Sequence, residues 1–189
     1  MDTLSYIIIV EELARVDSSQ AATVAAVNSL GLAPILKYGT EEQKRKFIPP
    51  LCKGERVWAF GLTEDNAGSD ALGSETSAEL VDGYWVINGS KSHITNATSD
   101  ISGGVTLQAV TAVVDGRKRL YTILVEKGTP GFTTERMLGK LMWRASDTGR
   151  LHFRDCRVPA ENLLGEPGQG GRIMLNTLDA GRLSIGAIG

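Results

Sequence analysis

The chain has 189 residues, of which 42% are hydrophobic and 22% charged, and its formal net charge is −2. These values are ordinary for a soluble globular protein and argue against a general nucleic-acid binder, which normally carries a clustered basic excess. The longest uninterrupted apolar run, Ile7 to Val10, is far shorter than the roughly 20 residues of a membrane span, so no membrane partner is expected.

The cysteines and histidines exclude two further classes. Cys52 and Cys156 are isolated in the sequence, which is typical of a reduced protein rather than of a disulfide framework. Neither a secretory signal nor a transit peptide is visible, so we expect a cytoplasmic location. His93 and His152 do not have metal-ligand spacing with the cysteines, and we expect no metal site.

The first third of the chain predicts helices. In the first helix the apolar residues cover so much of the circumference that burial on most sides is expected; they are Leu4, Ile7, Ile8, Val10, Leu13 and Ala14. A second helix is expected to begin with Ser18 or Ser19 as its N-cap and to end near Gly31, a residue type common just beyond helix ends.

A third helix is predicted from its capping signal. Thr40 is followed three residues later by Gln43, which is the pattern of a capping box. Pro49 and Pro50 are expected to stop this helix around Ile48, because proline lacks the backbone N–H and disfavours a helical residue before it.

From about Glu55 the pattern changes to strands. Asp82-Gly83 and Asn88-Gly89 bracket a short apolar run and are both expected to form tight turns. Further β-rich runs are Val105 to Val114, Leu120 to Val125, and Arg150 to Phe153. Frequent glycines and polar residues between these runs favour an antiparallel β-barrel or sandwich.

A final helix is predicted after Pro167-Gly168-Gln169-Gly170, with apolar residues at helical spacing up to the end of the chain. Because both terminal helices have apolar faces without a partner in the chain, we interpret the sequence as truncated at both ends. The expected class is α+β. It comprises the remnant of a helical domain (residues 1–54), a middle β-barrel domain (55–166) and the start of a second helical domain (167–189).

The segment Gly61 to Asp70, GLTEDNAGSD, is the most informative one. Hydroxyl groups and small residues follow a predicted strand, so backbone N–H groups can approach a ligand closely. Such a loop suits recognition of a phosphate or a heterocycle. A glycine turn between strands explains the same residues equally well.

This segment resembles the acyl-CoA dehydrogenase signature, in which an aliphatic-Ser/Thr-Glu run precedes a small-Gly-Ser/Thr-Asp run. Five further segments are similar to that family in order and rough spacing, and together they span nearly the whole chain. They are Val10–Asp17, Gly39–Lys44, Asn88–Lys91 with Ile94–Asn96, Val158–Gly165, and Leu178–Arg182.

The resemblance implies an FAD site and part of an acyl-CoA site. The expected cofactor-binding residues are Phe60, Leu62, Thr63, Gly68, Ser69, His93, Ile94 and Thr95. Thr63 is expected beside the isoalloxazine ring and Thr95 near its N5 atom. The expected substrate-binding residues are Ser69, Asp179 and Arg182, and the last two are neighbours on one helical face.

Two positions, His93 and Gly171, depart from the family pattern, and the family commonly has a phenylalanine at the second of them. The family has an aromatic ring where this chain has His93; an imidazole that stacks on the flavin is the favoured interpretation, and a proton-transfer role is the alternative. The family's catalytic carboxylate lies late in the chain or, in a minority of members, just before the conserved arginine. That second position is Gly181 here.

No catalytic residue is therefore expected within this chain. Glu64 and Asp70 belong to the signature loop, and we interpret both carboxylates as structural. Met137, Met142 and Trp143 are interpreted as core or interface residues rather than cofactor contacts.

The resemblance implies α,β-dehydrogenation of an acyl-CoA with FAD, an electron-transfer flavoprotein as electron acceptor, and a homo-oligomer. One alternative is an acyl-CoA oxidase, which passes electrons to oxygen. The other is a non-catalytic binding or assembly fragment.

Overall fold

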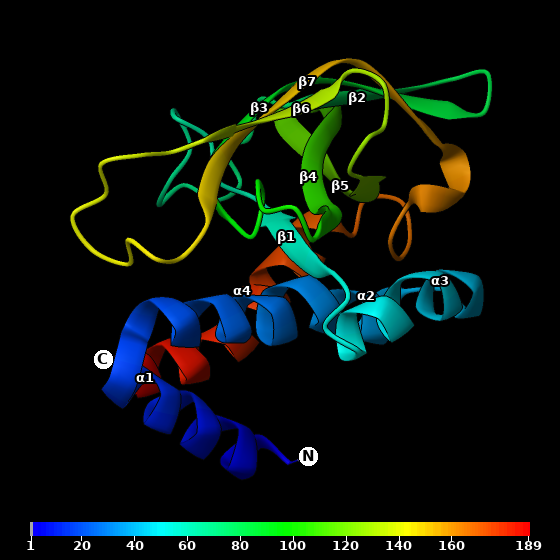
Figure 1. The fold of residues 1–189 in the computed structure, drawn as a ribbon. Helices are drawn as coiled ribbons and strands as arrows, with labels where there is room; N and C mark the ends of the chain where they lie inside the picture. Colours follow the sequence, from blue (N-terminus) through cyan, green and yellow to red (C-terminus); the bar gives the residue numbers. More distant parts are fainter. Residues whose placement is uncertain (1) are drawn as a thin grey trace.

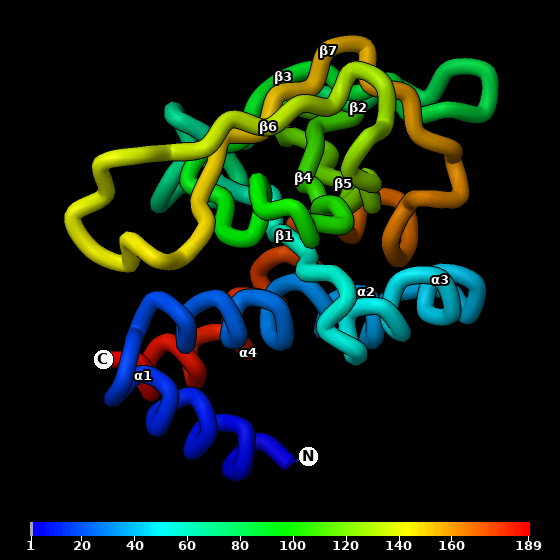
Figure 2. Tube along the Cα trace, in the orientation of Figure 1, coloured from blue at the N-terminus to red at the C-terminus, as the bar shows by residue number. Residues whose placement is uncertain are grey.

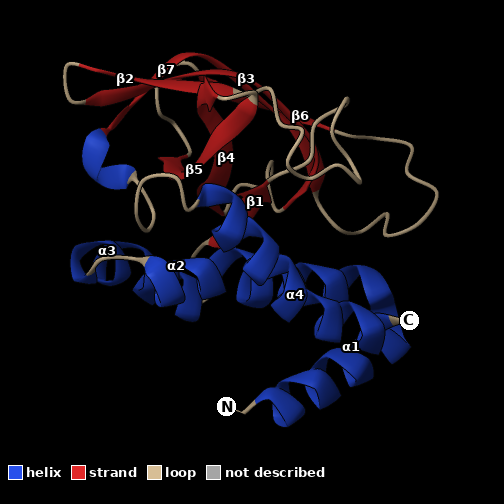
Figure 3. Cartoon of the chain, turned by 180° about the vertical axis from the view of Figure 1, so that it is seen from behind, coloured by secondary structure: helices blue, strands red, loops and turns tan. Residues whose placement is uncertain are grey.

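The computed structural model describes residues 2–189 and arranges them in two layers, helices on one side and a curled sheet on the other (Figure 1; Figure 3). The helical layer comprises α1 (Thr3–Ala25), the π-helical segment η1 (Ala26–Leu32), α2 (Ala33–Tyr38), α3 (Glu41–Cys52) and α4 (Gly170–Ile188). The strands are β1 (Val57–Gly61), β2 (Ser77–Val81), β3 (Tyr84–Thr95), β4 (Ser102–Val114), β5 (Arg117–Glu126), β6 (Phe132–Arg136) and β7 (Thr148–Pro159), and the short helix η2 (Ala160–Asn162) follows β7. The predicted α+β class is confirmed.

The strands form one sheet in the order β1-β4-β2-β3-β7-β6, and β5 pairs with β4 off this path. The sheet is antiparallel, as predicted, except where β4 meets β1 along its length and β2 at a single residue pair, Ser77 with Val110. Parallel pairing of β1 and β4 is possible because the long segment between them contains the hairpin of β2 and β3, which brings the chain back in the same direction.

One of the two predicted tight turns is confirmed. Asp82 and Gly83 join β2 to β3 with positive φ angles of 49° and 78°, as a two-residue hairpin turn requires. Asn88-Gly89, in contrast, lies inside β3, where the register with β7 shifts. The Asn88 side chain exchanges hydrogen bonds with Asp155 of β7, so this dipeptide forms a bulge rather than a turn.

The first helix is more exposed than its sequence predicts. Leu4 and Ile8 are 70% and 50% exposed, whereas Val10 is fully buried. The expectation of burial on most sides is therefore wrong for this half of α1. Burial in α1 is confined to one side, at Val10 in its first half and at Ser19, Ala21, Ala22 and Ala25 in its second half.

The predicted boundary between the first and second helices lies at a kink. Asp17 has extended φ and ψ angles of −152° and 106°, and its carboxylate accepts the N–H of Ser19 at 2.7 Å. Asp17, not Ser18 or Ser19, is therefore the N-cap of the second half.

The second helix also continues past the predicted end. Gly31 lies within η1, where an added Cβ would be 2.7 Å from the carbonyl oxygen of Trp58. The glycine is needed because the helix passes very close to β1, so it does not mark a helix end.

The capping box of α3 is confirmed. Thr40 Oγ1 accepts the N–H of Gln43, and the Gln43 side chain accepts the N–H of Thr40. The predicted stop near Ile48 is wrong, since α3 runs to Cys52. The helix tolerates Pro49 and Pro50 because the carbonyls left without a donor belong to Arg45 and Lys46, which are exposed to water.

Two apolar clusters hold the layers together. One fills the inside of the curled sheet with residues from β1 to β7, among them Ile87, Leu107 and Leu151. The other cluster joins the sheet to the helices through Trp58. The ring centroids of Trp58 and Phe47 lie 5.0 Å apart, and the indole N–H of Trp58 donates to Thr106 Oγ1 at 3.0 Å. The helical layer is therefore fixed to β1 rather than loosely attached.

The long connection between β6 and β7 also reaches the helices. It is drawn in yellow in Figure 2 and comes close to the second half of α1 at Thr23. Ser146 Oγ lies 3.3 Å from Thr23 Oγ1, and the Asn96 side chain donates to the Thr23 carbonyl at 3.4 Å. These contacts join the second half of α1 to the β6–β7 connection and to the segment that follows β3.

One helical stretch, residues 3–38, is long and apolar enough to cross a membrane by length and composition alone. Of its most apolar window, 44% is buried inside the protein. Core helices of soluble proteins meet the same criteria, so this stretch is weak evidence for a membrane span.

Replacement of Gly89 tests the bulge. In Gly89→Ala the new Cβ would lie 2.7 Å from Thr76 Cα at a φ of 138°, so we expect a loss of about 2–4 kcal/mol in the free energy of unfolding. Gly116→Ala is the matched control, since Gly116 also has positive φ but open space around it, and should lose about 1 kcal/mol. Equal urea midpoints for the two variants would contradict the close contact.

Candidate functional site

Two adjoining cavities lie where the helical layer meets the sheet. The smaller has a volume of about 150 Å³ and is lined by Ala26, Leu30, Trp58, Phe60, Leu62, Thr63, His93, Ile94, Thr95 and Leu178. The larger has a volume of about 340 Å³ and is lined by Ala22, Ala25, Ala26, Ser29, Leu30, Thr95, Trp143, Leu178, Gly181, Arg182, Ser184 and Ile185. Ala26, Leu30, Thr95 and Leu178 line both, so a ligand in one cavity would contact the wall of the other.

The smaller cavity is bordered by the ends of two strands that are distant in sequence. Thr63 follows β1, and His93 and Thr95 belong to the end of β3. The Ser92 N–H donates to the Thr63 carbonyl at 2.9 Å, which ties these segments together. His93 has a φ of 59° where the register of β3 with β7 shifts, and it lines the cavity while remaining exposed to solvent.

The structure brings together six of the eight predicted cofactor residues. Phe60, Leu62, Thr63, His93, Ile94 and Thr95 all line the smaller cavity. Gly68 and Ser69 instead lie exposed on the loop after β1 and line neither cavity.

The predicted substrate pair is only partly at the larger cavity. Arg182 lines it, whereas Asp179 does not. The two side chains form an ion pair with each other on the exposed face of α4. Both charged groups are more than half exposed, and a surface pair of this kind contributes little to stability.

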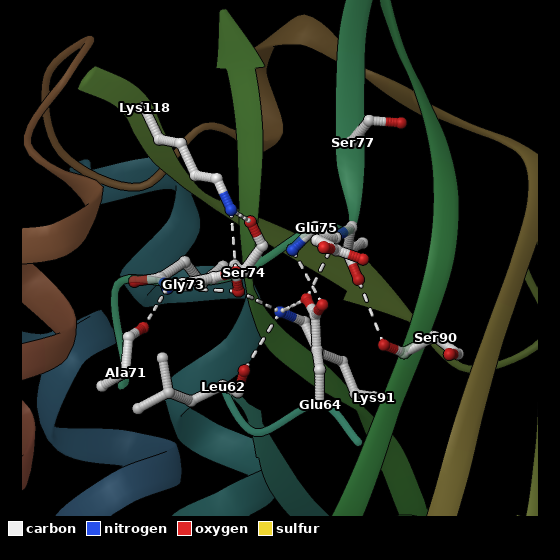
Figure 4. A network of polar contacts seen from close by, with 12 residues as sticks. Leu62, Glu64, Ala71, Gly73, Ser74, Glu75, Ser77, Ser90, Lys91 and Lys118 are labelled. Carbon is white, nitrogen blue, oxygen red and sulfur yellow. Dashed lines mark hydrogen bonds and ion pairs between the residues drawn. The ribbon is translucent and has the colours of Figure 1, made fainter. Parts of the chain in front are cut away.

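The loop that carries Gly68 and Ser69 is held by a buried ion pair between Glu64 and Lys91 (Figure 4). Lys91 Nζ donates to Glu64 Oε1 at 2.7 Å, to Ser74 Oγ at 2.9 Å and to the Leu62 carbonyl at 3.1 Å. All three protons of the ammonium group therefore have an acceptor. The Lys91 side chain has no exposed surface, and that of Glu64 is 5% exposed.

The Glu64 carboxylate is equally well satisfied. It accepts the N–H groups of Glu75 and Thr76 at 2.8 and 3.1 Å in addition to Lys91. The loop of residues 64–76 is thus closed at its base by one carboxylate, while its tip stays exposed. The interpretation of Glu64 as structural agrees with this geometry.

The pair also changes the acid–base properties of both groups. Burial acts to raise the pKa of Glu64, but the Lys91 hydrogen bond and charge, together with the N–H of Glu75 and a bond from Thr76, lower it to about 2. Burial lowers the pKa of Lys91 to about 8, against the opposing effect of Glu64. Glu64 is therefore ionised at neutral pH and unsuited to accept a proton.

Neither cavity has a carboxylate among its described lining residues. Gly181 is buried on the wall of the larger cavity, and an added Cβ would lie 3.1 Å from Leu30 Cδ2 and 3.7 Å from Ser29 Oγ. Asp70 is exposed and lines neither cavity. Within residues 2–189 no group of three or more His, Cys, Asp or Glu side chains is placed to hold a metal ion.

Sequence reasoning missed two residues here. The only sequence feature that could have indicated Lys91 is a lysine within a predicted strand. Its burial could not be predicted, because it depends on Glu64, 27 positions away. Trp143, interpreted as core or interface, lines the larger cavity with a φ of 51°. It belongs to the connection between β6 and β7, so nothing in its local sequence indicates where it packs.

Comparison with known families identifies both parts of the chain. Residues 59–156 match the model described as "Acyl-CoA dehydrogenase, middle domain", and residues 1–55 match "Acyl-CoA dehydrogenase, N-terminal domain".

Curated relatives carry the same description. A protein named "Acyl-CoA dehydrogenase, short-chain specific" from Megasphaera elsdenii is 45% identical over 98% of this chain and 48% of the relative. "Short-chain specific acyl-CoA dehydrogenase, mitochondrial" from Mus musculus is 41% identical over 98% of this chain and 44% of the relative. The chain spans about half the length of these relatives.

Solved structures have the same fold over the whole chain. The butyryl-CoA dehydrogenase of Megasphaera elsdenii superimposes with a TM-score of 0.93 at 44% identity, covering 99% of this chain and 49% of that one. A chain from a structure described as the electron transferring flavoprotein of Acidaminococcus fermentans superimposes with a TM-score of 0.93 at 42% identity. The match covers 100% of this chain and 49% of that one. An acyl-CoA dehydrogenase complexed with FAD from Bacillus anthracis superimposes with a TM-score of 0.90 at 37% identity. The match covers 100% of this chain and 32% of that one.

Replacement of Lys91 tests the buried pair. Lys91→Met leaves the Glu64 carboxylate buried without its partner, so we expect the free energy of unfolding to fall by about 3–5 kcal/mol. Lys53→Met is the control, because Lys53 lies 3.8 Å from Glu55 with 67% of its side chain exposed, and its loss should be below about 1 kcal/mol. Similar urea unfolding curves for both variants would exclude a structural role for the pair.

The acid dependence of stability provides a second test. The folded-state pKa of Glu64 lies below its ordinary value of 4.5, at about 2. The stabilisation of the folded state by ionised Glu64 is therefore fully present above pH 4.5 and is lost as the pH falls toward 2. We expect wild type to lose more stability across this window than Glu64→Gln, which cannot titrate there. Parallel curves of unfolding free energy against pH would contradict the depressed pKa.

Proposed function

Because this chain belongs to the acyl-CoA dehydrogenase family, we propose that it supplies the flavin-binding part of an enzyme that removes hydrogen from the α and β carbons of a short-chain acyl-CoA. The observation that carries this proposal is the pair of adjoining cavities. Thr95 and Leu178 lie in the wall between them, so a flavin in the smaller cavity and an acyl group in the larger one would be in contact.

The smaller cavity fits a flat heterocycle with polar edges. Phe60 and Ile94 supply apolar surface, and Thr63 and Thr95 supply hydroxyl groups at the ends of the two strands. A few placed polar groups in an otherwise apolar wall are typical of cofactor sites. When bound, FAD supplies the hydride acceptor; the two threonines position its ring edge, and Leu178 excludes water between it and the substrate.

The larger cavity suits a short acyl group. Its wall consists mainly of small and aliphatic side chains, including Ala22, Ala25 and Ile185. Arg182 lies at its edge with most of its side chain exposed, where a guanidinium can bind a phosphate of the CoA moiety. The names of the relatives from Megasphaera elsdenii and Mus musculus support the short-chain class.

The α-proton requires a base that this chain does not place in either cavity. A general base must come within hydrogen-bond reach of the proton it removes. Glu64 is committed to Lys91 and Asp70 is exposed outside the cavities. The absence of a catalytic residue from these 189 residues stays a prediction, and we propose that the carboxylate comes from outside this sequence.

We assign an electron-transfer flavoprotein as the electron acceptor, in line with the description of the Acidaminococcus fermentans structure. Oxidase chemistry on the same fold is the alternative within enzymes, and a non-catalytic binding or assembly role is the alternative outside them. Oxygen consumption with an acyl-CoA would indicate the oxidase.

We also propose a homo-oligomer. Leu4, Ile8 and Ile185 are each at least half exposed on the terminal helices, and apolar surface of this kind is usually covered in an assembly. A cytoplasmic location stays a prediction, since a mitochondrial protein is among the relatives.

The function is tested by flavin binding and turnover together. We expect the isolated chain to be purified with little or no FAD, because the contacts present here are only part of a complete site. Added FAD should bind weakly but saturably, and Thr95→Trp, which fills the shared wall, should abolish this binding. Thr133→Trp is the control, since Thr133 is exposed on β6 and lines neither cavity.

Turnover of butyryl-CoA with a dye acceptor should be lower than that of a complete enzyme by at least about 10²–10⁴-fold, the usual effect of a missing general base. Gly181→Glu places a carboxylate on the wall of the larger cavity and should raise the rate. Ordinary activity of the unmodified chain would mean that a residue interpreted as structural is the base, with Glu64 the first to replace. Failure of FAD to bind at any concentration would exclude this chain as a sufficient flavin site.

A further inference from the structure

A further cavity lies in the long connection between β6 and β7, the yellow segment of Figure 2. Its volume is about 160 Å³, and its walls are Arg136, Met137, Leu138, Gly139, Lys140, Arg144 and Ser146. All of them belong to the end of β6 or to the connection itself. Since a water molecule occupies roughly 30 Å³ in the liquid, the cavity has room for a ligand of about five heavy atoms.

The charged groups around this cavity are all positive. Arg136, Lys140 and Arg144 line it, and no carboxylate does. The cavity beside α3 differs, because Asp100 and Glu126 lie among the cations that line it. Like charges around one small space repel each other, so the arrangement favours an anion between them.

The carboxylates closest in sequence already have partners outside the cavity. Asp147 is the one acid in residues 137–147. It accepts the N–H groups of Thr98 and Ser99 at 2.7 and 3.0 Å. Glu135 of β6 lies beside His152 of β7, 3.3 Å from its Nε2. Neither carboxylate lines the cavity.

The cationic side chains keep donors available. The Lys140 ammonium group is held by the Ser146 carbonyl at 2.5 Å and by Thr148 Oγ1 at 2.7 Å, which leaves one of its three protons without an acceptor. Within residues 2–189 the guanidinium groups of Arg136 and Arg144 take part in no hydrogen bond or ion pair. Each of them can therefore bind an anion without breaking an existing contact.

The backbone adds further donors. Gly139 has a φ of 74° with open space around it. In the part of the chain that the structure describes, the N–H groups of Leu138, Gly139 and Lys140 have no hydrogen-bond partner. Successive free N–H groups at such a turn form concavities that bind anions. Side chains and backbone thus favour the same class of ligand.

We propose that this cavity binds a phosphate group. Arg136 and Arg144 can each offer two parallel N–H groups to phosphate oxygens, and Lys140 offers its remaining proton. The group is either free inorganic phosphate or a phosphate of a nucleotide such as CoA. The site does not depend on the function proposed above, because neither a flavin nor an acyl group takes part in it.

An anion in this cavity should also affect the larger cavity. Trp143, which lies between Lys140 and Arg144 in the sequence, lines the larger cavity. Ser146 lines the anion cavity, and its Oγ lies 3.3 Å from Thr23 Oγ1 of α1. Because a phosphate that bridges the cations would order the connection, we expect it to change the surroundings of Trp143.

Calorimetric titration with inorganic phosphate tests the site, with sodium chloride at equal ionic strength as reference, since salt alone screens exposed charges. We expect saturable binding that weakens at least roughly tenfold in Arg136→Gln and in Arg144→Gln, because each loses charge-assisted hydrogen bonds. Arg117→Gln is the matched control, since Arg117 is exposed at the start of β5 and lines none of the described cavities. Equal affinities for all three variants at unchanged urea midpoints, or no saturation in the wild type, would overturn the proposal.

NMR of the three indole N–H groups tests the link to the larger cavity. Those of Trp58 and Trp85 bond to Thr106 and Ala160, whereas that of Trp143 is buried without a partner. Phosphate should shift the Trp143 signal, identified by its loss in Trp143→Phe, and leave the other two in place. A Trp143 signal that stays unchanged at saturating phosphate would overturn the link.

Free CoA distinguishes the two sources of the phosphate group. If the nucleotide is the occupant, CoA should displace inorganic phosphate, and its own affinity should fall in Arg144→Gln. If free phosphate is the occupant, its affinity should be the same with and without CoA. Displacement of phosphate by CoA with undiminished CoA affinity in both arginine variants would contradict the assignment of the site to this cavity.

Discussion

A lysine side chain with no exposed surface can remain charged only if the protein itself satisfies its ammonium group. Lys91 meets this condition with three acceptors, from Glu64, Ser74 and Leu62. Glu64 in turn holds the N–H groups of Glu75 and Thr76. The ion pair thus joins β3 to both ends of the loop after β1, and the border of the smaller cavity depends on it.

Local signals in the sequence were reliable where the physics is local. The capping box at Thr40 and the turn at Asp82-Gly83 each involve neighbouring residues only, and both form as predicted. Gly31 and Gly89 were predicted from equally local patterns to mark a helix end and a turn. In the structure each instead allows a close contact, because Trp58 and Thr76 approach them from distant parts of the chain. A glycine in the sequence is consistent with a close approach of another part of the chain, but it does not indicate which segment approaches.

The candidate site follows the same division. The motifs predict residues at the ends of β1 and β3, and the Ser92–Thr63 backbone hydrogen bond brings these two segments together. Their role in binding a cofactor stays a prediction. The exposed positions of Ser69 and Asp179 could not be predicted, because they depend on how the loop and α4 pack. Lys91 was missed because a buried charge is recognisable only with its partner. Trp143 was missed because it lies in a long connection that contacts α1 through Ser146, 123 positions away from Thr23.

Trp58 contacts the helices, the sheet and the smaller cavity at once. Its ring packs on Phe47 of α3, its N–H bonds to Thr106 of β4, and its surface forms part of the smaller cavity. Indole emission responds to nearby acceptors and to local polarity. The protein therefore contains its own optical probe at the junction of helices, sheet and cavity, and rearrangement of any one of them would change the light it emits.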